Sequence, residues 1–269
     1  MNIGIFDSGF GGLDILKHIV KELPEYNFIY LGDTARAPYG ARSKEIIYKF
    51  TEQAVDFLFK NDCQLVILAC NTASSDALRK IQQKYLIKKN SDKRVLGVII
   101  PAVEQAVQDT KNNKIGVMAT EASVNSGAFE REIKKLNPKI RVFQQACPLL
   151  VPIIENGEKD NQIINLAIKN YLSPLIKKKI DVLILGCTHY GIIKNKILNI
   201  AGSNIKIISE GEIIARKLKD YLKRHPEINN VLERKYKRVF FSTDLTDKFS
   251  LLGNKFFGQD IKAKVALLK

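Results

Sequence analysis

A doubled series of short apolar runs is the feature that most constrains this chain. The run "NIGIFDSG", which begins at Asn2, aligns with "KIGVMATEA", which begins at Lys114. Three further pairs follow in the same order: "NFIYLGDTA" with "IRVFQQACP", "QLVILACNTAS" with "IDVLILGCTHYG", and "RVLGVII" with "NIKIISE". Cys187 follows Cys70 by 117 residues, and the offset of the other pairs is similar. Four matches in one order indicate a duplicated structural unit.

Each half of the repeat alternates apolar runs with amphipathic segments. The runs are rich in Ile, Val and Leu and lack polar alternation, which is typical of strands that are covered on both faces. The predicted strands are Ile3–Phe6, Phe28–Leu31, Leu65–Ala69, Val95–Ile99, Lys114–Met118, Ile140–Phe143, Val182–Leu185, Ile205–Ile208 and Arg238–Phe241. Because strands and helices alternate, we expect βαβ units and a mainly parallel arrangement.

Three local signals concern the helices between these strands. Ser43 has the chemistry of an N-cap for a helix over 43–60, with Glu45 in its first turn. Pro101 suits the first position of a helix that runs to about Asp109. Pro174 lies inside a helical pattern, which it should kink or end.

Two similar halves predict an α/β protein of two pseudo-symmetric lobes with mainly parallel sheets. We expect residues 1–98 and 209–269 to form the first lobe and residues 99–208 to form the second. The length of 269 residues agrees with about two domains of ordinary size. Ligands of open α/β sheets bind at the carboxyl ends of the strands, so we expect the active site in the cleft between the lobes.

The charge and composition bear on partners and location. The formal net charge is +15, but the lysines are scattered as short pairs and triplets, so we do not expect a nucleic-acid partner. A positive field could still attract a small anionic substrate. No apolar run approaches the roughly 18 residues of a membrane span, and the start of the chain lacks a secretory signal. We therefore expect a cytoplasmic protein without a membrane partner. The sequence leaves open whether the protein forms a homodimer.

The four cysteines divide into two kinds. They have no C-x-x-C spacing, so we expect free thiols, with structural roles for Cys63 and Cys147. The three histidines are far apart in the sequence, and we expect no metal. Cys70 and Cys187 each end an apolar strand, in "VILACNTAS" and "LILGCTHYG", at equivalent places of the repeat. The repeat therefore predicts that these two thiols face each other across one cleft.

Two opposed thiols suit the inversion of a carbon centre. One thiolate removes a proton from one face of a tetrahedral carbon while the other thiol delivers a proton to the opposite face. A free thiol has a pKa of about 8.5, so a neighbouring charge, a base or free backbone N–H groups must help to form the thiolate. The residues after each cysteine open a helix or a turn, where such N–H groups are available.

Small polar side chains and glycines adjoin both strand ends. Asp7 and Ser8 stand at the end of the first strand, and His189 stands two positions after Cys187. The small donors suited to carboxylates are Asn71, Thr72 and Thr188. The glycines expected to let the backbone approach a ligand closely are Gly9, Gly11 and Gly12.

Five motifs in this order resemble the glutamate racemase family. They are "FDSGFGGL", "YLGDTARAPYG", "LACNTAS", "ACPLLVPIIENG" and "LGCTHYG". The resemblance runs from Asn2 to about Ala215 and continues weakly beyond it. It implies two α/β lobes with the site between them and racemisation of glutamate without a cofactor. In bacteria, this family supplies D-glutamate for peptidoglycan.

The resemblance also implies roles for matching residues. Cys70 and Cys187 are implied as the acid/base thiols, with Asp7 supporting the first, and with His189 and nearby Glu155 supporting the second. The implied substrate-binding residues are Asp7, Ser8, Tyr39, Gly40, Asn71, Thr72, Thr120, Thr188 and His189. Asp33 matches a motif position without a clear role. Two segments depart from the family pattern, "SEGE" at 209–212 and "FFSTDLTDKF" at 240–249, and we expect both to lie away from the cysteines.

Other activities remain open on the sequence alone. The first is an aspartate racemase of the same superfamily, although the histidine after the second Cys-Thr favours glutamate. A hydrolase or transferase with one nucleophilic cysteine would leave the second thiol unexplained. A pyridoxal-phosphate racemase would use one of the many lysines, and a nucleic-acid-binding regulator would use the positive charge.

Overall fold

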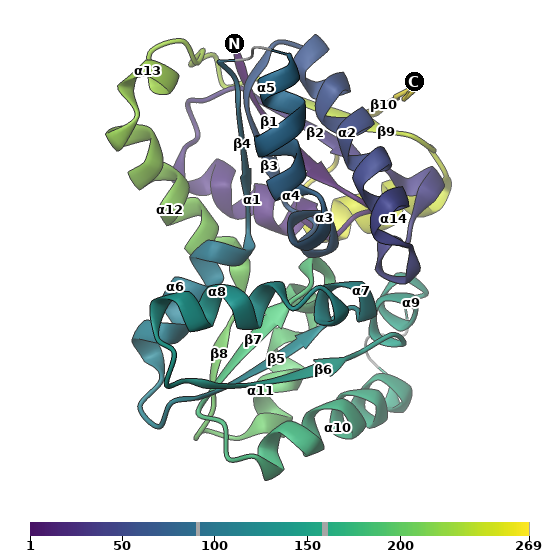
Figure 1. Ribbon diagram of the computed structural model, residues 1–269. Helices are drawn as coiled ribbons and strands as arrows, with labels where there is room; N and C mark the ends of the chain where they lie inside the picture. The colour runs from purple at the N-terminus through teal and green to yellow at the C-terminus, as the bar shows by residue number, and fades with distance from the viewer. Residues whose placement is uncertain (90–91, 158–160, 269) are drawn as a thin grey trace.

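The computed structural model describes residues 1–89, 92–157 and 161–268. Its strands form two separate sheets, and all the paired neighbours within them run parallel. Figure 1 shows one sheet with its helices in the upper half of the view and the other in the lower half. The predicted α/β class with two lobes of mainly parallel strands is confirmed.

The first sheet contains six strands in the order β10-β9-β2-β1-β3-β4. These strands span Asn2–Asp7 (β1), Phe28–Gly32 (β2), Cys63–Leu68 (β3), Arg94–Gly97 (β4), Arg238–Ser242 (β9) and Ala263–Val265 (β10). β10 was not predicted from the sequence. The predicted fourth strand, Val95–Ile99, ends at Gly97 in the structure, because Ile99 begins a helix.

The second sheet contains four strands in the order β6-β5-β7-β8. They span Lys114–Ala119 (β5), Arg141–Ala146 (β6), Val182–Gly186 (β7) and Lys206–Ile208 (β8). This order repeats the order β2-β1-β3-β4 of the first sheet. Ile3 pairs with Leu65 as Ile115 pairs with Val182, so the register of the central strands is also the same. The duplicated unit predicted from the sequence is therefore present in the fold.

The register corrects part of the sequence alignment. Ile3 pairs with Phe28, and its equivalent Ile115 pairs with Val142. In the sequence alignment, Phe28 stood opposite Arg141, which is one residue before its structural equivalent. The alignment of β4 with β8 was wrong by two residues, because Arg94 is equivalent to Lys206 in the structure. β6 and β8 lie at the edges of their sheet and are only partly buried, so their apolar pattern defines the register weakly.

Helices connect the strands and cover the sheets. The longer ones are α1 (Gly12–Glu22), α2 (Lys44–Lys60), α6 (Ile99–Asp109), α8 (Ala128–Leu136), α10 (Gln162–Lys177), α11 (Lys194–Ala201), α12 (Glu210–Arg224) and α14 (Asp247–Phe257). The shorter ones are η1 (Thr34–Arg36), η2 (Tyr39–Ala41), α3 (Asn71–Asp76), α4 (Leu78–Lys80), the π-helical η3 (Ile81–Tyr85), α5 (Leu86–Lys88), α7 (Glu121–Asn125), α9 (Leu150–Glu155), η5 (Thr188–Ile193) and α13 (Pro226–Asn229). Within the described ranges, no helix is long and apolar enough to cross a membrane.

The predicted helix signals had different outcomes. Ser43 is the N-cap of α2 and its side chain accepts a hydrogen bond from the Ile46 N–H, as expected. Pro101 is the third residue of α6, not the first, because the helix already begins at Ile99. Pro174 does not end α10, which continues to Lys177. The proline lacks only the one helical hydrogen bond that its own N–H would donate, and it lies in the last turn of the helix.

One apolar cluster runs through both lobes. Ile5 of β1 packs in it with residues of α1, and Leu183 of β7 and Ile168 of α10 belong to the same cluster. The helix α12, which follows the second sheet, packs mainly against α1 of the first lobe. Burial of apolar surface therefore joins the lobes as well as forming each of them.

Gly32, the last residue of β2, leaves room for the loop that follows β1. A Cβ at Gly32 would lie 2.7 Å from the Gly9 carbonyl oxygen, which already accepts a 2.9 Å hydrogen bond from the Tyr30 hydroxyl. We expect Gly32→Ala to lower the free energy of unfolding in urea by about 1–3 kcal/mol, because backbone must shift. Gly9→Ala is the matched control, since its Cβ would have no neighbour closer than 3.7 Å. Equal losses in the two variants would contradict this account.

Candidate active site

The ends of equivalent strands from both sheets meet around one cavity. Ser8 follows β1, Cys70 follows β3 after one residue, Thr120 follows β5 and Cys187 follows β7. The cavity has a volume of about 30 Å³. Its walls are Ser8, Gly9, Ala37, Pro38, Tyr39, Gly40, Cys70, Asn71, Thr72, Thr120, Val151, Glu155, Cys187, Thr188 and His189. All the implied site residues line it except Asp7, which is fully buried next to it.

Cys70 is held at the start of α3. It is the N-cap of this helix, and its Sγ accepts a hydrogen bond from the Ala73 N–H at 3.5 Å. The Ser8 hydroxyl lies 3.3 Å from the same sulfur. Burial raises the pKa of the Cys70 thiol to about 11, and the Asp7 carboxylate raises it further, against the lowering effect of these donors. The thiol is therefore protonated at neutral pH in the empty site.

Cys187 has a histidine beside it. Its Sγ lies 3.9 Å from Nδ1 of His189, and Nε2 of that ring lies 3.0 Å from Oε1 of Glu155. The carboxylate of Glu155 thus orients the imidazole toward the sulfur. Burial raises the pKa of Cys187 well above its usual value, and the backbone N–H of His189 opposes this shift.

Asp7 connects the two halves of the site. The Gly9 N–H donates to its Oδ2 at 2.9 Å, and the Thr188 hydroxyl donates to its Oδ1 at 3.3 Å. Burial raises the pKa of Asp7, while the charge of His189 lowers it. Ser8, not Asp7, makes the side-chain contact to Cys70.

Threonine side chains form a second connection. The hydroxyls of Thr72 and Thr120 lie 2.9 Å apart, and Thr120 is the N-cap of α7 through a hydrogen bond from the Ser123 N–H. Gly40 packs directly against Thr120, because a Cβ at Gly40 would lie 2.8 Å from the Thr120 Cβ. Gly40 therefore contributes close packing at the cavity wall.

Asp33, which had no clear role in the sequence, holds Tyr39 in the wall. Its buried carboxylate accepts hydrogen bonds from the Tyr39 hydroxyl, from Arg36 Nε at 2.7 Å and from the Thr243 hydroxyl at 2.9 Å. Burial and this carboxylate both raise the pKa of Tyr39, which stays a neutral phenol. Through Thr243, the segment 240–249 supports Tyr39 indirectly, and none of its described residues is among the cavity walls, which agrees with the expectation that it lies away from the cysteines.

The expectation that residues 209–212 lie away from the cysteines is wrong. Ser209 and Glu210 line a small cavity of about 10 Å³ together with Cys187. They follow β8, which is the neighbour of β7 in the sheet, so the ends of both strands lie at one edge. The alignment of "RVLGVII" with "NIKIISE" could have predicted this position of Ser209 and Glu210, because equivalent strands of a repeat end at equivalent places.

Two of the glycines after Asp7 pack closely against side chains of the site. A Cβ at Gly11 would lie 2.3 Å from the Thr188 hydroxyl oxygen, and a Cβ at Gly12 would lie 2.5 Å from the Asp7 Cβ. Their close approach is therefore to side chains of the site itself. A Cβ at Gly9 would lie 3.7 Å from its nearest neighbour, the Glu155 Oε1, so the space at Gly9 is less restricted.

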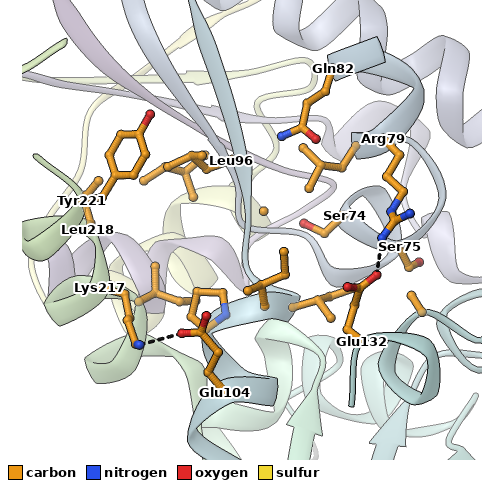
Figure 2. A pocket seen from close by; sticks show the side chains of 18 of the residues that line it. Ser74, Ser75, Arg79, Gln82, Leu96, Glu104, Glu132, Lys217, Leu218 and Tyr221 are labelled. Atoms are coloured by element: carbon orange, nitrogen blue, oxygen red, sulfur yellow. Dashed lines mark hydrogen bonds and ion pairs between the residues drawn. The ribbon is translucent and has the colours of Figure 1, made fainter. Parts of the chain in front are cut away.

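A larger cavity of about 510 Å³ lies outside this site. Figure 2 shows its walls, where Lys217 pairs with Glu104 and Arg79 pairs with Glu132, each at 2.6 Å. None of the implied site residues lines it. Ser74 on α3 faces it, although Asn71 and Thr72 on the same helix face the site.

Other potential reactive groups lie elsewhere. Cys63 and Cys147 are buried free thiols outside the cavity, in agreement with structural roles. In the described part of the chain, no group of three or more His, Cys, Asp and Glu side chains has an arrangement that could hold a metal ion.

The comparison with known proteins identifies the family. A family model described as Asp/Glu/Hydantoin racemase matches residues 3–218. The chain belongs to the Asp/Glu/hydantoin racemase family. This confirms the resemblance on which the site residues were selected.

Relatives within the family are glutamate racemases. The chain is 41% identical over 261 residues to that of Persephonella marina, covering 97% of this chain and 95% of the relative. It is 40% identical over 256 residues to that of Geobacter metallireducens, covering 95% and 92%. The crystal structure of glutamate racemase from Francisella tularensis in complex with D-glutamate aligns with a TM-score of 0.89 at 36% identity, covering 99% and 97%. These relatives are amino-acid racemases, which are isomerases.

The raised pKa of Cys70 predicts a stability effect at alkaline pH. The thiol has a pKa of about 11 in the folded protein and about 8.5 in an unfolded chain, so the folded state retains its proton across this window. Stability is unaffected below the lower value and falls as the pH rises through the window. Cys70→Ser should make this fall less steep by up to about 1.4 kcal/mol per pH unit, measured by urea unfolding in reducing buffer. From pH 6 to 8, the free energy of unfolding should change with pH in the same way in the unmodified protein and in Cys70→Ser. If the two curves stayed parallel up to pH 10.5, the raised pKa of Cys70 would be contradicted.

Proposed function

We propose that this protein is a glutamate racemase that interconverts L- and D-glutamate with Cys70 and Cys187 as its two acid/base groups. The observation that carries the proposal is that both thiols line one cavity, one from each copy of the repeat. The similarity to glutamate racemases over nearly the whole chain supports the substrate. The cellular role that follows is the supply of D-glutamate for peptidoglycan synthesis, in the cytoplasm.

The reaction needs proton transfer at one carbon and nothing else. One cysteine, as thiolate, takes a proton from Cα and leaves the bonding pair on the carbon, and the other, as thiol, donates a proton to the opposite face. The product then has the inverted configuration, and the two cysteines have exchanged protonation states. General acid–base steps of this kind contribute about 10²–10⁴-fold to a rate.

The charge of the substrate helps to form the thiolate. In the empty cavity, burial and the neighbouring Asp7 carboxylate both disfavour a charged sulfur. The ammonium group of a bound amino acid brings a positive charge next to the sulfurs, which lowers a thiol pKa. In this proposal, Ser8 contacts that ammonium from the cavity wall, the buried Asp7 carboxylate behind it supplies negative charge, and the hydroxyls of Thr72, Thr120 and Thr188 contact the carboxylates.

The cavity leaves little free space for the substrate. Its volume is about 30 Å³, whereas glutamate has ten non-hydrogen atoms. The Thr72–Thr120 and Asp7–Thr188 contacts join the two sheets across the site. We propose that the lobes, residues 1–98 with 209–269 and residues 99–208, separate at these contacts and close again over the amino acid.

Replacement of either thiol should abolish racemisation. We expect Cys70→Ala and Cys187→Ala each to lower kcat for L-glutamate and for D-glutamate by at least about 10²-fold, measured by circular dichroism of the substrate. Cys63→Ala and Cys147→Ala are the matched controls, because these buried thiols lie outside the cavity. Near-normal turnover in either site variant would refute the two-thiol assignment. Turnover of aspartate alone by the unmodified protein would refute the substrate.

Deuterated water distinguishes proton transfer from other cysteine chemistry. With L-glutamate in D₂O, the D-glutamate product should carry deuterium at Cα, because the proton that arrives comes from a thiol in exchange with solvent. Mass spectrometry of the separated enantiomers measures this label. Unlabelled product would exclude the two-thiol route and would favour a different mechanism.

A further inference from the structure

A buried carboxyl group that this mechanism does not use lies beside the site. Glu210 is the first residue of α12 and is only 4% exposed. Its Oε2 accepts a 2.8 Å hydrogen bond from Nδ2 of Asn71. Asn71 is the first residue of α3, directly after Cys70, whereas Glu210 comes two residues after β8 of the second sheet. The bond therefore links the segment that carries one thiol to the start of α12, which follows the edge strand of the sheet that carries the other thiol.

The two side chains are not fully satisfied by each other. In the described part of the chain, Oδ1 of Asn71 and Oε1 of Glu210 are buried without a hydrogen-bond partner. Burial of polar atoms without partners is unfavourable, and apolar side chains of similar size often pack such a place at least as stably. The stability of the fold therefore does not explain why Asn71 and Glu210 are paired here. The pairing points instead to a role in orienting the Asn71 amide.

The hydrogen bond determines which end of the amide is free. A side-chain amide has a donor end and an acceptor end, and the donor end of Asn71 is turned to Glu210. Asn71 also lines the active-site cavity, so its free oxygen is available to an N–H donor of a bound amino acid. Burial raises the pKa of Glu210 to about 8, but a carboxyl group accepts the Asn71 N–H in either protonation state.

We propose that Glu210 is a positioning residue that holds the Asn71 amide with its oxygen free for the substrate. Glu210 shares the cavity of about 10 Å³ with Cys187, so the same bond lies between the two thiol segments and helps to set their spacing. The inference rests on the proposed function, since it assigns Asn71 a contact with the amino acid.

Two variants of similar size separate orientation from packing. Glu210→Gln keeps an oxygen that accepts the Asn71 N–H, whereas Glu210→Met removes it. Glu212→Met, on the exposed side of the same helical turn, is the matched control. In ¹H–¹⁵N spectra, the side-chain NH₂ signal of Asn71, assigned by its loss in Asn71→Ala, should be retained and protected from exchange in Glu210→Gln. It should move to the position of a free amide in Glu210→Met.

The kinetic test uses the same proteins with both enantiomers of glutamate. Glu210→Gln should retain kcat/KM within about threefold, and Glu210→Met should lose at least about tenfold with a raised KM. Asn71→Ala combined with Glu210→Met should be no worse than Asn71→Ala alone, because the two residues act as one unit. Wild-type-like kcat/KM in Glu210→Met, or losses that multiply in the double variant, would overturn the proposal.

The two measurements separate this inference from the proposed function. If the unmodified protein racemises neither glutamate nor aspartate, the proposed function fails, and the amide signal still decides whether Glu210 holds Asn71. If Glu210→Met does not fold, Glu210→Gln decides: loss of the protected signal in that variant would overturn the proposal.

Discussion

The hydrogen bond from Thr188 to Asp7 joins the two copies of the repeat at the carboxyl ends of their strands. Thr188 directly follows Cys187, and Asp7 ends the strand beside the one that leads to Cys70. Two parallel sheets can share a site only if these edges face each other, and this bond lies at their meeting point. The Thr72–Thr120 contact joins the same edges, and the Asn71–Glu210 contact joins the start of α3 to the start of α12. If the lobes close as we propose, these contacts also set the spacing of the two sulfurs.

The electrostatics of the site favour neutral thiols until a ligand is present. Asp7 and Glu210 both raise the pKa of Cys187, and burial raises it most. The opposing groups are few: the hydroxyl and N–H of Ser8 and the N–H of Ala73 at Cys70, and the N–H of His189 at Cys187. In the mechanism that we propose, the thiolate therefore forms in response to the positively charged substrate and not before it.

Much of this architecture follows from local sequence patterns. The apolar runs located nine of the ten strands in the described structure, and the repeat placed Cys70 and Cys187 at equivalent strand ends. Those features depend on periodicity within short segments, which a single sequence displays directly. The resemblance to glutamate racemases then indicated Tyr39 and Glu155, whose own sequence context gives no signal, and both line the cavity.

The remaining features depend on contacts between distant segments. Asp33 holds Tyr39 with the help of Thr243, and Glu210 reaches Asn71 across the two halves of the chain. Neither contact has a local pattern that would predict it. Gly11 is also unexplained locally, because the side chain that it accommodates belongs to Thr188. Sequence patterns locate the strand ends, whereas tertiary packing decides which polar groups meet there.

The most direct test of the central claim is a crystal structure with D-glutamate bound, in which the distances from each Sγ to Cα are measured. The account predicts that the sulfurs of Cys70 and Cys187 lie in van der Waals contact with Cα on opposite faces. Both sulfurs on one face, or either one turned away into a separate cavity, would contradict it.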